Sequence, residues 1–161
     1  MKRRLLFLFA VFMVGASVGW GQMIPTYYKV AVGTGGDGSS AGSPIYKANL
    51  EAALSDAALS SLDSVIILLP EGEYSANAAP YSITKSSLAI IGEGDTSTVT
   101  IKSPVDIELT NGGNVSFQKV HLTAKTSTGR GVVDIKSSKT TVSFSESKIT
   151  IEGRGTGDSG S

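Results

Sequence analysis

The sequence predicts an all-β protein, a short right-handed parallel β-helix of about three coils with an N-terminal capping helix. Two observations lead to this prediction. Short segments of alternating apolar and polar residues recur along the chain at a nearly constant offset, and one helical segment precedes them. Because a single coil cannot bury its apolar face alone, a constant period of this kind is typical of solenoids whose coils stack.

The repeat is carried by three groups of matching segments. The offset is 27 residues in two groups and 28 in the third. The segments are 88–90, 115–117 and 142–144 (LAI, VSF, VSF), 122–124 and 149–151 (LTA, ITI), and 105–107 and 133–135 (VDI, VDI). Stacked coils would place Phe117 on Phe144, one strand spacing of about 4.8 Å apart. A leucine-rich repeat would need a spaced leucine pattern that is absent, and an immunoglobulin-like sandwich would not explain the recurrence.

The elements ahead of the repeat have their own signals. Residues 27–32 (YYKVAV) are aromatic and β-branched, which predicts a first strand. Apolar residues at helical spacing over 47–62 predict a helix, with Ser43 as its N-cap and Pro44 just inside. Residues 64–70 (SVIILLP) are typical of a strand buried on both faces of a parallel sheet.

The chain divides into four predicted parts. Residues 1–21 predict a signal peptide, because the basic residues 2–4 precede an apolar run over 5–14 that is shorter than the ~20 residues of a membrane span. Cleavage after Ala16 and after Gly21 both satisfy the preference for small residues. The remaining parts are an N-terminal strand, Gly/Ser loop and capping helix (22–62), the β-helix coils (63–152) and a flexible tail (153–161).

The composition of the chain limits its expected cellular location and its expected partners. The chain has 14 basic and 14 acidic residues, and loss of Lys2, Arg3 and Arg4 leaves 11 against 14, a net charge near −3. The remaining basic residues are scattered, so we expect no nucleic-acid partner, and membrane contact only through an uncleaved signal peptide. No cysteine is present. We expect a secreted or cell-surface protein, periplasmic or extracellular in a bacterium.

Two strand motifs carry a family resemblance. Residues 63–74 (DSVIILLPEGEY) and 88–94 (LAIIGEG) are similar to the D-x-I-x-L-x-P-G-x-Y and L-x-I-x-G-x-G strands of right-handed parallel β-helix proteins of the pectin-lyase-like superfamily. The resemblance covers residues 28–151 but rests on the N-terminal cap and first coils. It implies the fold and little about activity, since members include polysaccharide lyases, glycoside hydrolases, epimerases, adhesins and surface antigens.

The predicted number of coils is lower than in the enzymes of that superfamily, which usually carry many more. No capping element follows residues 149–151, so an open coil end would expose apolar residues and unpaired backbone groups. Two hypotheses follow: the chain is a truncated product, or it stacks on a partner.

Stacking also predicts ladders of polar residues on the outer faces. Opposite charges meet where Glu108 lies over Lys136 and where Lys119 lies over Glu146, and each pair contributes a few tenths of a kcal/mol. Asp106 over Asp134 is the one unfavourable ladder. Two carboxylates could share Ca²⁺, but they are few for an oxygen-seeking ion. His121, the single histidine, aligns with Lys148 one coil on and has no catalytic partner in the pattern.

The remaining polar features do not single out a site. Glu71, Glu73, Glu93 and Asp95 follow strands, and nothing in their spacing selects a pair for acid–base chemistry on a glycosidic bond. The loop over 33–42 (GTGGDGSSAG) lacks the order of a phosphate-binding loop. We therefore expect no catalytic, cofactor-binding or metal-binding residue.

Three function classes follow. The first is a non-catalytic surface or secreted binding module of the adhesin type, with a polysaccharide or cell-surface glycan as candidate partner. The second is the N-terminal part of a polysaccharide lyase or glycoside hydrolase. The third is a structural or assembly protein that self-associates through its uncapped C-terminal coil.

Overall fold

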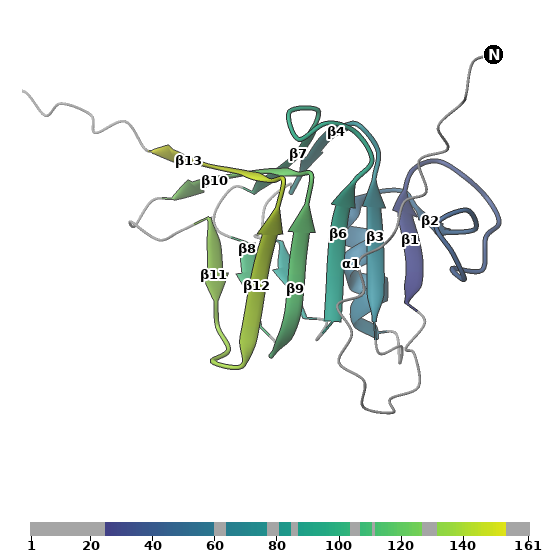
Figure 1. The fold of residues 1–161 in the computed structure, drawn as a ribbon, viewed down its shortest axis with the longest axis horizontal. Helices are drawn as coiled ribbons and strands as arrows, with labels where there is room; N and C mark the ends of the chain where they lie inside the picture. Colours follow the sequence, from purple (N-terminus) through teal and green to yellow (C-terminus); the bar gives the residue numbers. More distant parts are fainter. Residues whose placement is uncertain are drawn as a thin grey trace, which may run out of the picture.

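The computed structural model describes residues 25–59, 64–76, 81–84, 87–103, 107–110, 112–126 and 132–153. Within these residues the protein is mostly β, with three parallel sheets and one short helix (Figure 1). The predicted signal peptide over 1–21, the end of the predicted helix and most of the predicted tail lie outside the described residues. Gly153, predicted to begin the tail, ends the last strand instead.

The first sheet has six strands in the order β12-β9-β6-β3-β1-β2, the second has four in the order β13-β10-β7-β4, and the third has three in the order β11-β8-β5. Strand bounds in the first sheet are β1 (Thr26–Val30), β2 (Ile45–Lys47), β3 (Val65–Leu69), β6 (Ser87–Gly92), β9 (Gly113–Gln118) and β12 (Thr140–Ser145). Those in the second are β4 (Gly72–Ser75), β7 (Val99–Ser103), β10 (His121–Thr126) and β13 (Lys148–Gly153). Those in the third are β5 (Ser82–Ile83), β8 (Ile107–Leu109) and β11 (Val133–Ile135).

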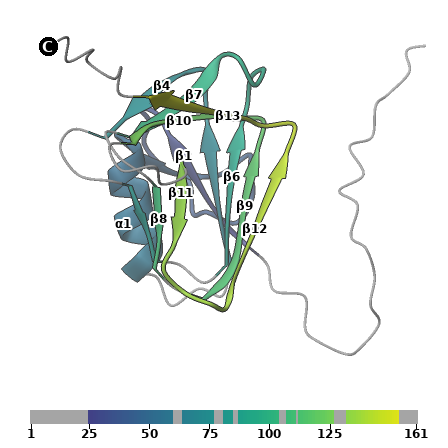
Figure 2. The ribbon, with the colours of Figure 1, turned by 90° about the vertical axis from the view of Figure 1, so that its left-hand side faces the viewer.

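From β3 onward the chain visits the three sheets in turn, and from β6 onward every strand pairs in parallel with the strand three places earlier. Figure 2 shows the result in cross-section: strands of the first sheet run up, those of the second cross the top, and those of the third run down. Inward residues therefore stack in ladders, and their apolar side chains form one continuous core.

The predicted 27-residue offset is confirmed in two sheets. Val115 pairs with Val142, and Phe117 with Phe144, whose rings stack at 5.4 Å between centroids and 11° between planes. Leu122 pairs with Ile149 in the second sheet. The offset of 28 in the third sheet is wrong, because Ile107 pairs with Val133 and the true offset is 26. A shift of two residues keeps each side chain on its face, so the alternation of the sequence fits both alignments.

The helix begins later than predicted. Residues 45–47 form β2 beside β1, and α1 spans Leu50–Leu59. Asn49 is the N-cap in place of Ser43, since its side-chain oxygen accepts a hydrogen bond from the Ala52 amide at 2.8 Å. Residues 45–47 form a strand and not the start of the helix because their backbone pairs with the edge of β1. The local sequence pattern does not show this pairing.

The helix α1 covers the first end of the core. Its inward residues Leu50, Ala53, Leu54 and Ala57 are buried and belong to the core cluster. An ion pair of 2.9 Å between Lys47 and Asp56 ties α1 to β2. The Lys47 hydrogen bond, followed by that of the Tyr28 hydroxyl, holds the pKa of Asp56 below its usual value.

Gly92 has a steric reason to be glycine. A Cβ at this position would lie 2.1 Å from the backbone oxygen of Lys119, in the next turn of the stack. The turn residues Lys119 and Glu146 themselves adopt left-handed φ angles of 53° and 49° although neither is glycine. The bend between the first and second sheets is therefore built from close backbone approach in successive turns.

Candidate interaction surface at the end of the sheets

The charged residues of the third sheet are aligned differently from the prediction. Lys136 lies 3.6 Å from Glu108, which confirms that pair, and it also contacts Asp134. Asp134 lies opposite Glu108 rather than opposite Asp106, because the strand offset is 26. The expected Asp106–Asp134 ladder is therefore wrong for Asp134, and Asp106 lies outside the described residues. The single positive charge of Lys136 offsets part of the repulsion between these two carboxylates.

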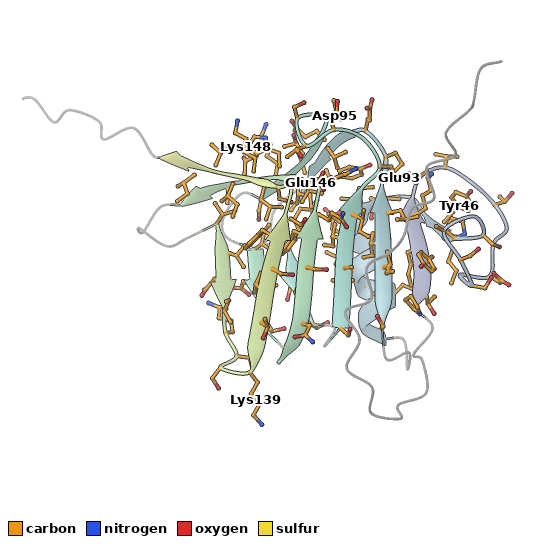
Figure 3. All side chains as sticks on the ribbon, in the orientation of Figure 1. Tyr46, Glu93, Asp95, Lys139, Glu146 and Lys148 are labelled. Carbon is orange, nitrogen blue, oxygen red and sulfur yellow. The ribbon has the colours of Figure 1, made fainter. Side chains whose placement is uncertain are left out.

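The turn acids predicted after the strands are dispersed among separate partners. Glu93 forms an ion pair of 2.8 Å with Lys29. Glu73 accepts a hydrogen bond from Ser75 and pairs with Lys102 at 3.2 Å, which together hold its pKa below the usual value. The Thr98 hydroxyl donates to Glu71 at 3.3 Å. Figure 3 shows Glu93 and Asp95 near the turns that join the first and second sheets.

His121 lies on the outer face of the second sheet. It is aligned with Lys148, as predicted, and its Nε2 lies 2.8 Å from the Thr150 hydroxyl on β13. In the part of the chain that the structure describes, no group of three or more His, Cys, Asp or Glu side chains is placed to hold a metal ion. Within the same residues, no helix has the length and apolar character needed to cross a membrane.

The Gly/Ser loop between β1 and β2 is held by its own hydrogen bonds. Asp37 accepts from both the amide and the hydroxyl of Ser39, at 3.0 and 2.7 Å, and these bonds lower its pKa to about 2. Gly36 and Gly38 adopt positive φ angles of 84° and 75°. At Gly36 an added Cβ would lie 1.9 Å from the Pro44 oxygen. The glycines serve the local turn geometry.

Exposed apolar residues gather on the last rung, which we define as β11, β12 and β13. Four of its apolar residues occupy positions that face the core one rung earlier, yet they are exposed. Their exposed fractions, each followed by that of the paired residue one rung earlier, are Ile135 48% and Leu109 0%, Phe144 42% and Phe117 1%, Ile149 47% and Leu122 0%, and Ile151 54% and Ala124 0%. These residues are matched in register, so the difference comes from the absence of a following strand in the described structure.

The backbone shows the same discontinuity. Each of β11, β12 and β13 is the terminal strand of its sheet among the described residues. A terminal strand presents a row of unpaired N–H and C=O groups, which can template pairing with another chain. We call these three free edges, together with Ile135, Phe144, Ile149 and Ile151, the open end. Figure 1 shows it at the opposite side of the molecule from β1 and β2.

Comparison of the chain with protein-family models, with curated proteins and with solved structures returned no match. The candidate site therefore rests on the geometry of this chain. An open coil end was expected from the sequence, and β11, β12 and β13 are the terminal strands of their sheets among the described residues. The Lys136–Glu108 pair was predicted from the sequence, whereas the contact of Lys136 with Asp134, two residues earlier in the chain, was not.

Proposed function

We propose that this chain is an exported, non-catalytic protein that folds as a right-handed parallel β-helix and acts as an interaction module, docking a protein surface onto its open end. The observation that carries the docking function is the contrast in exposure between matched positions, such as 47% for Ile149 against 0% for Leu122. Contiguous exposed apolar side chains beside unpaired strand edges are typical of protein–protein contact sites.

The β-helix architecture is supported by the path of the chain. From β3 onward successive strands enter the first, second and third sheets in a fixed cycle, and β11, β12 and β13 each pair in parallel with the strand three places earlier. The stacked rings of Phe117 and Phe144 form the internal ladder expected from such a coil. The resemblance to pectin-lyase-like proteins predicts the same architecture and adds the right-handed sense.

The non-catalytic assignment is supported by where the charged side chains lie. Glu93 and Glu73 are each held by a lysine from a neighbouring strand, at 2.8 and 3.2 Å. Such pairs are explained by cross-strand stabilisation of exposed sheet faces. A glycan ligand and an N-terminal piece of a polysaccharide lyase or glycoside hydrolase stay alternatives, and no arrangement among the described side chains favours either.

Export rests on residues 1–21 and is tested separately from docking. Expression of the full chain in a secreting host should release a protein shortened by the predicted signal peptide, with intact-mass analysis placing the new N-terminus after Ala16 or Gly21. Recovery of the uncut chain with the membrane fraction would instead mean that the segment is retained as an anchor.

Docking is tested by hydrogen exchange on dilute protein, in a concentration range where light scattering reports a single chain. Amides of β12 and β13 that face the free edge should exchange far faster than those of β9 and β10, because no further strand pairs with them in the described part of the chain. The double variant Ile149→Thr, Ile151→Thr should keep the fold and lose binding of an apolar-surface dye.

The matched control is Thr123→Ser on the buried rung, which leaves the open end intact. Equal protection of β13 and β10 in the single chain would overturn the proposal, since the chain would then cover its own open end.

A further inference from the structure

The free edge of β13 has a defined pattern of available backbone groups. The Lys148 amide donates to the Val120 oxygen at 3.0 Å, so the backbone of Lys148 faces β10. Hydrogen-bonding direction alternates along a parallel strand. The amide and carbonyl groups of Ile149 and Ile151 therefore point to the free edge, and β13 is the terminal strand of its sheet among the described residues.

The sequence of β13 is self-complementary when read in opposite directions. Its first five positions are Lys148, Ile149, Thr150, Ile151 and Glu152. Antiparallel pairing of two copies about Thr150 places position 148 opposite position 152 and position 149 opposite position 151. By register, a lysine position is then opposite a glutamate position at both ends, and isoleucine positions are opposite each other between them. Opposite charges and apolar pairs directly across an antiparallel ladder are both stabilising.

The hydrogen-bonding pattern selects the same register. In an antiparallel pair, residues that exchange both N–H···O bonds alternate with residues that exchange none. The register about Thr150 sets Ile149 opposite Ile151 of the other copy, and these are the residues whose backbone groups point to the free edge. Addition of a copy in parallel with the same register would instead set Lys148 beside Lys148, which is unfavourable.

The rest of the open end is compatible with this symmetry. Figure 2 shows β12 and β11 on opposite sides of the second sheet, running in opposite directions. A two-fold axis perpendicular to the second sheet, passing between Thr150 of one copy and Thr150 of the other, would bring β12 of one copy to the side of β11 of the other. The exposed side chains of Phe144 and Ile135 would then lie within the contact. A two-fold contact uses the same patch on both copies and closes after two chains.

Resting on the proposed docking function, we propose that the occupant of the open end is a second copy of this chain, related by a two-fold axis, with β13 pairing antiparallel to its copy about Thr150. This assignment makes the protein an end-to-end dimer in which each core covers the other.

A charge swap tests the occupant and the register together. Lys148→Glu and Glu152→Lys each set two like-charged pairs across the axis and should weaken dimerisation about tenfold or more, measured by sedimentation equilibrium. The double variant Lys148→Glu, Glu152→Lys restores opposite charges at both ends and should recover the wild-type dissociation constant. Lys102→Glu is the control for a charge change two strands inward on the same sheet. It breaks the ion pair with Glu73 and should lower stability, but it should leave the dimer dissociation constant unchanged.

The outcomes separate this inference from the docking function. Wild-type protein that stays a single chain at high concentration, with fast exchange at β13, would overturn the second copy as occupant while leaving the open end free for another protein. Open-ended polymers would contradict the two-fold axis, and a dimer indifferent to both single charge changes would contradict the register. Slow exchange at β13 in the single chain would instead remove the docking function itself.

Discussion

The first and last parts of the stacked sheets are built from the same kind of parallel strand, but they end differently. At the first end, α1 places Leu50 and Leu54 against the core, which keeps strand residues such as Tyr28 buried. At the last rung, Ile149 and Ile151 occupy equivalent inward positions and remain about half exposed. The burial of an inward residue in this fold therefore depends on the strand or helix that packs next to it along the stack, and only partly on its own strand.

The largest expected effect comes from truncating the same side chain at matched positions in two rungs. Phe117→Ala should lower the free energy of unfolding by about 3–5 kcal/mol, since this ring is buried on all sides. Phe144→Ala should cost less than about 1.5 kcal/mol, because it loses one ring stack and leaves no enclosed cavity. Urea unfolding of dilute protein measures both. Equal losses would mean that Phe144 is covered in solution.

An intermediate effect is expected from weakening the cover at the first end. Asn49→Ala removes the N-cap of α1 and should cost about 1 kcal/mol, within a range of roughly 0.5–2. The control is Asn114→Ala, which makes the same chemical change at an exposed position of β9 and should stay within about 0.5 kcal/mol of wild type. Similar losses in both variants would argue that the cap is not what holds α1 in place.

The smallest effect concerns the buried hydroxyl of Tyr81, beneath the same end. It has no hydrogen-bond partner among the described residues, so Tyr81→Phe should be neutral or stabilising by up to about 1 kcal/mol at pH 7. Thermal or urea unfolding measures this change, and a clear loss of stability would reveal a partner for the hydroxyl.

The pH dependence of the same variant has a definite sign. Burial, followed by the nearby charge of Glu51, raises the pKa of Tyr81 above its ordinary value of 10.0. The folded chain then keeps a proton that the unfolded chain releases, so stability is full below pH 10 and falls as the pH rises beyond it. Tyr81→Phe should reduce this alkaline loss, with Tyr28 and Tyr74, whose pKa values burial also raises, responsible for what remains.

The alternation of apolar residues and the repeat of VSF at an offset of 27 determined which strands stack and which side chains face inward, because a strand in a stacked sheet repeats its environment at each turn. An open coil end was also expected from the sequence, and among the described residues β11, β12 and β13 are the terminal strands of their sheets. These features depend on the periodicity of the sequence, which can be recognised without a structure.

Tertiary structure alone decided the features that depend on competition between neighbours. Residues 45–47 pair with the edge of β1 as a strand, so α1 starts only at Leu50. In the third sheet the strands pair at an offset of 26 residues, where the sequence pattern also allowed 28. In both places the local sequence pattern is compatible with two arrangements. Backbone hydrogen bonding and packing against residues distant in the chain make the choice.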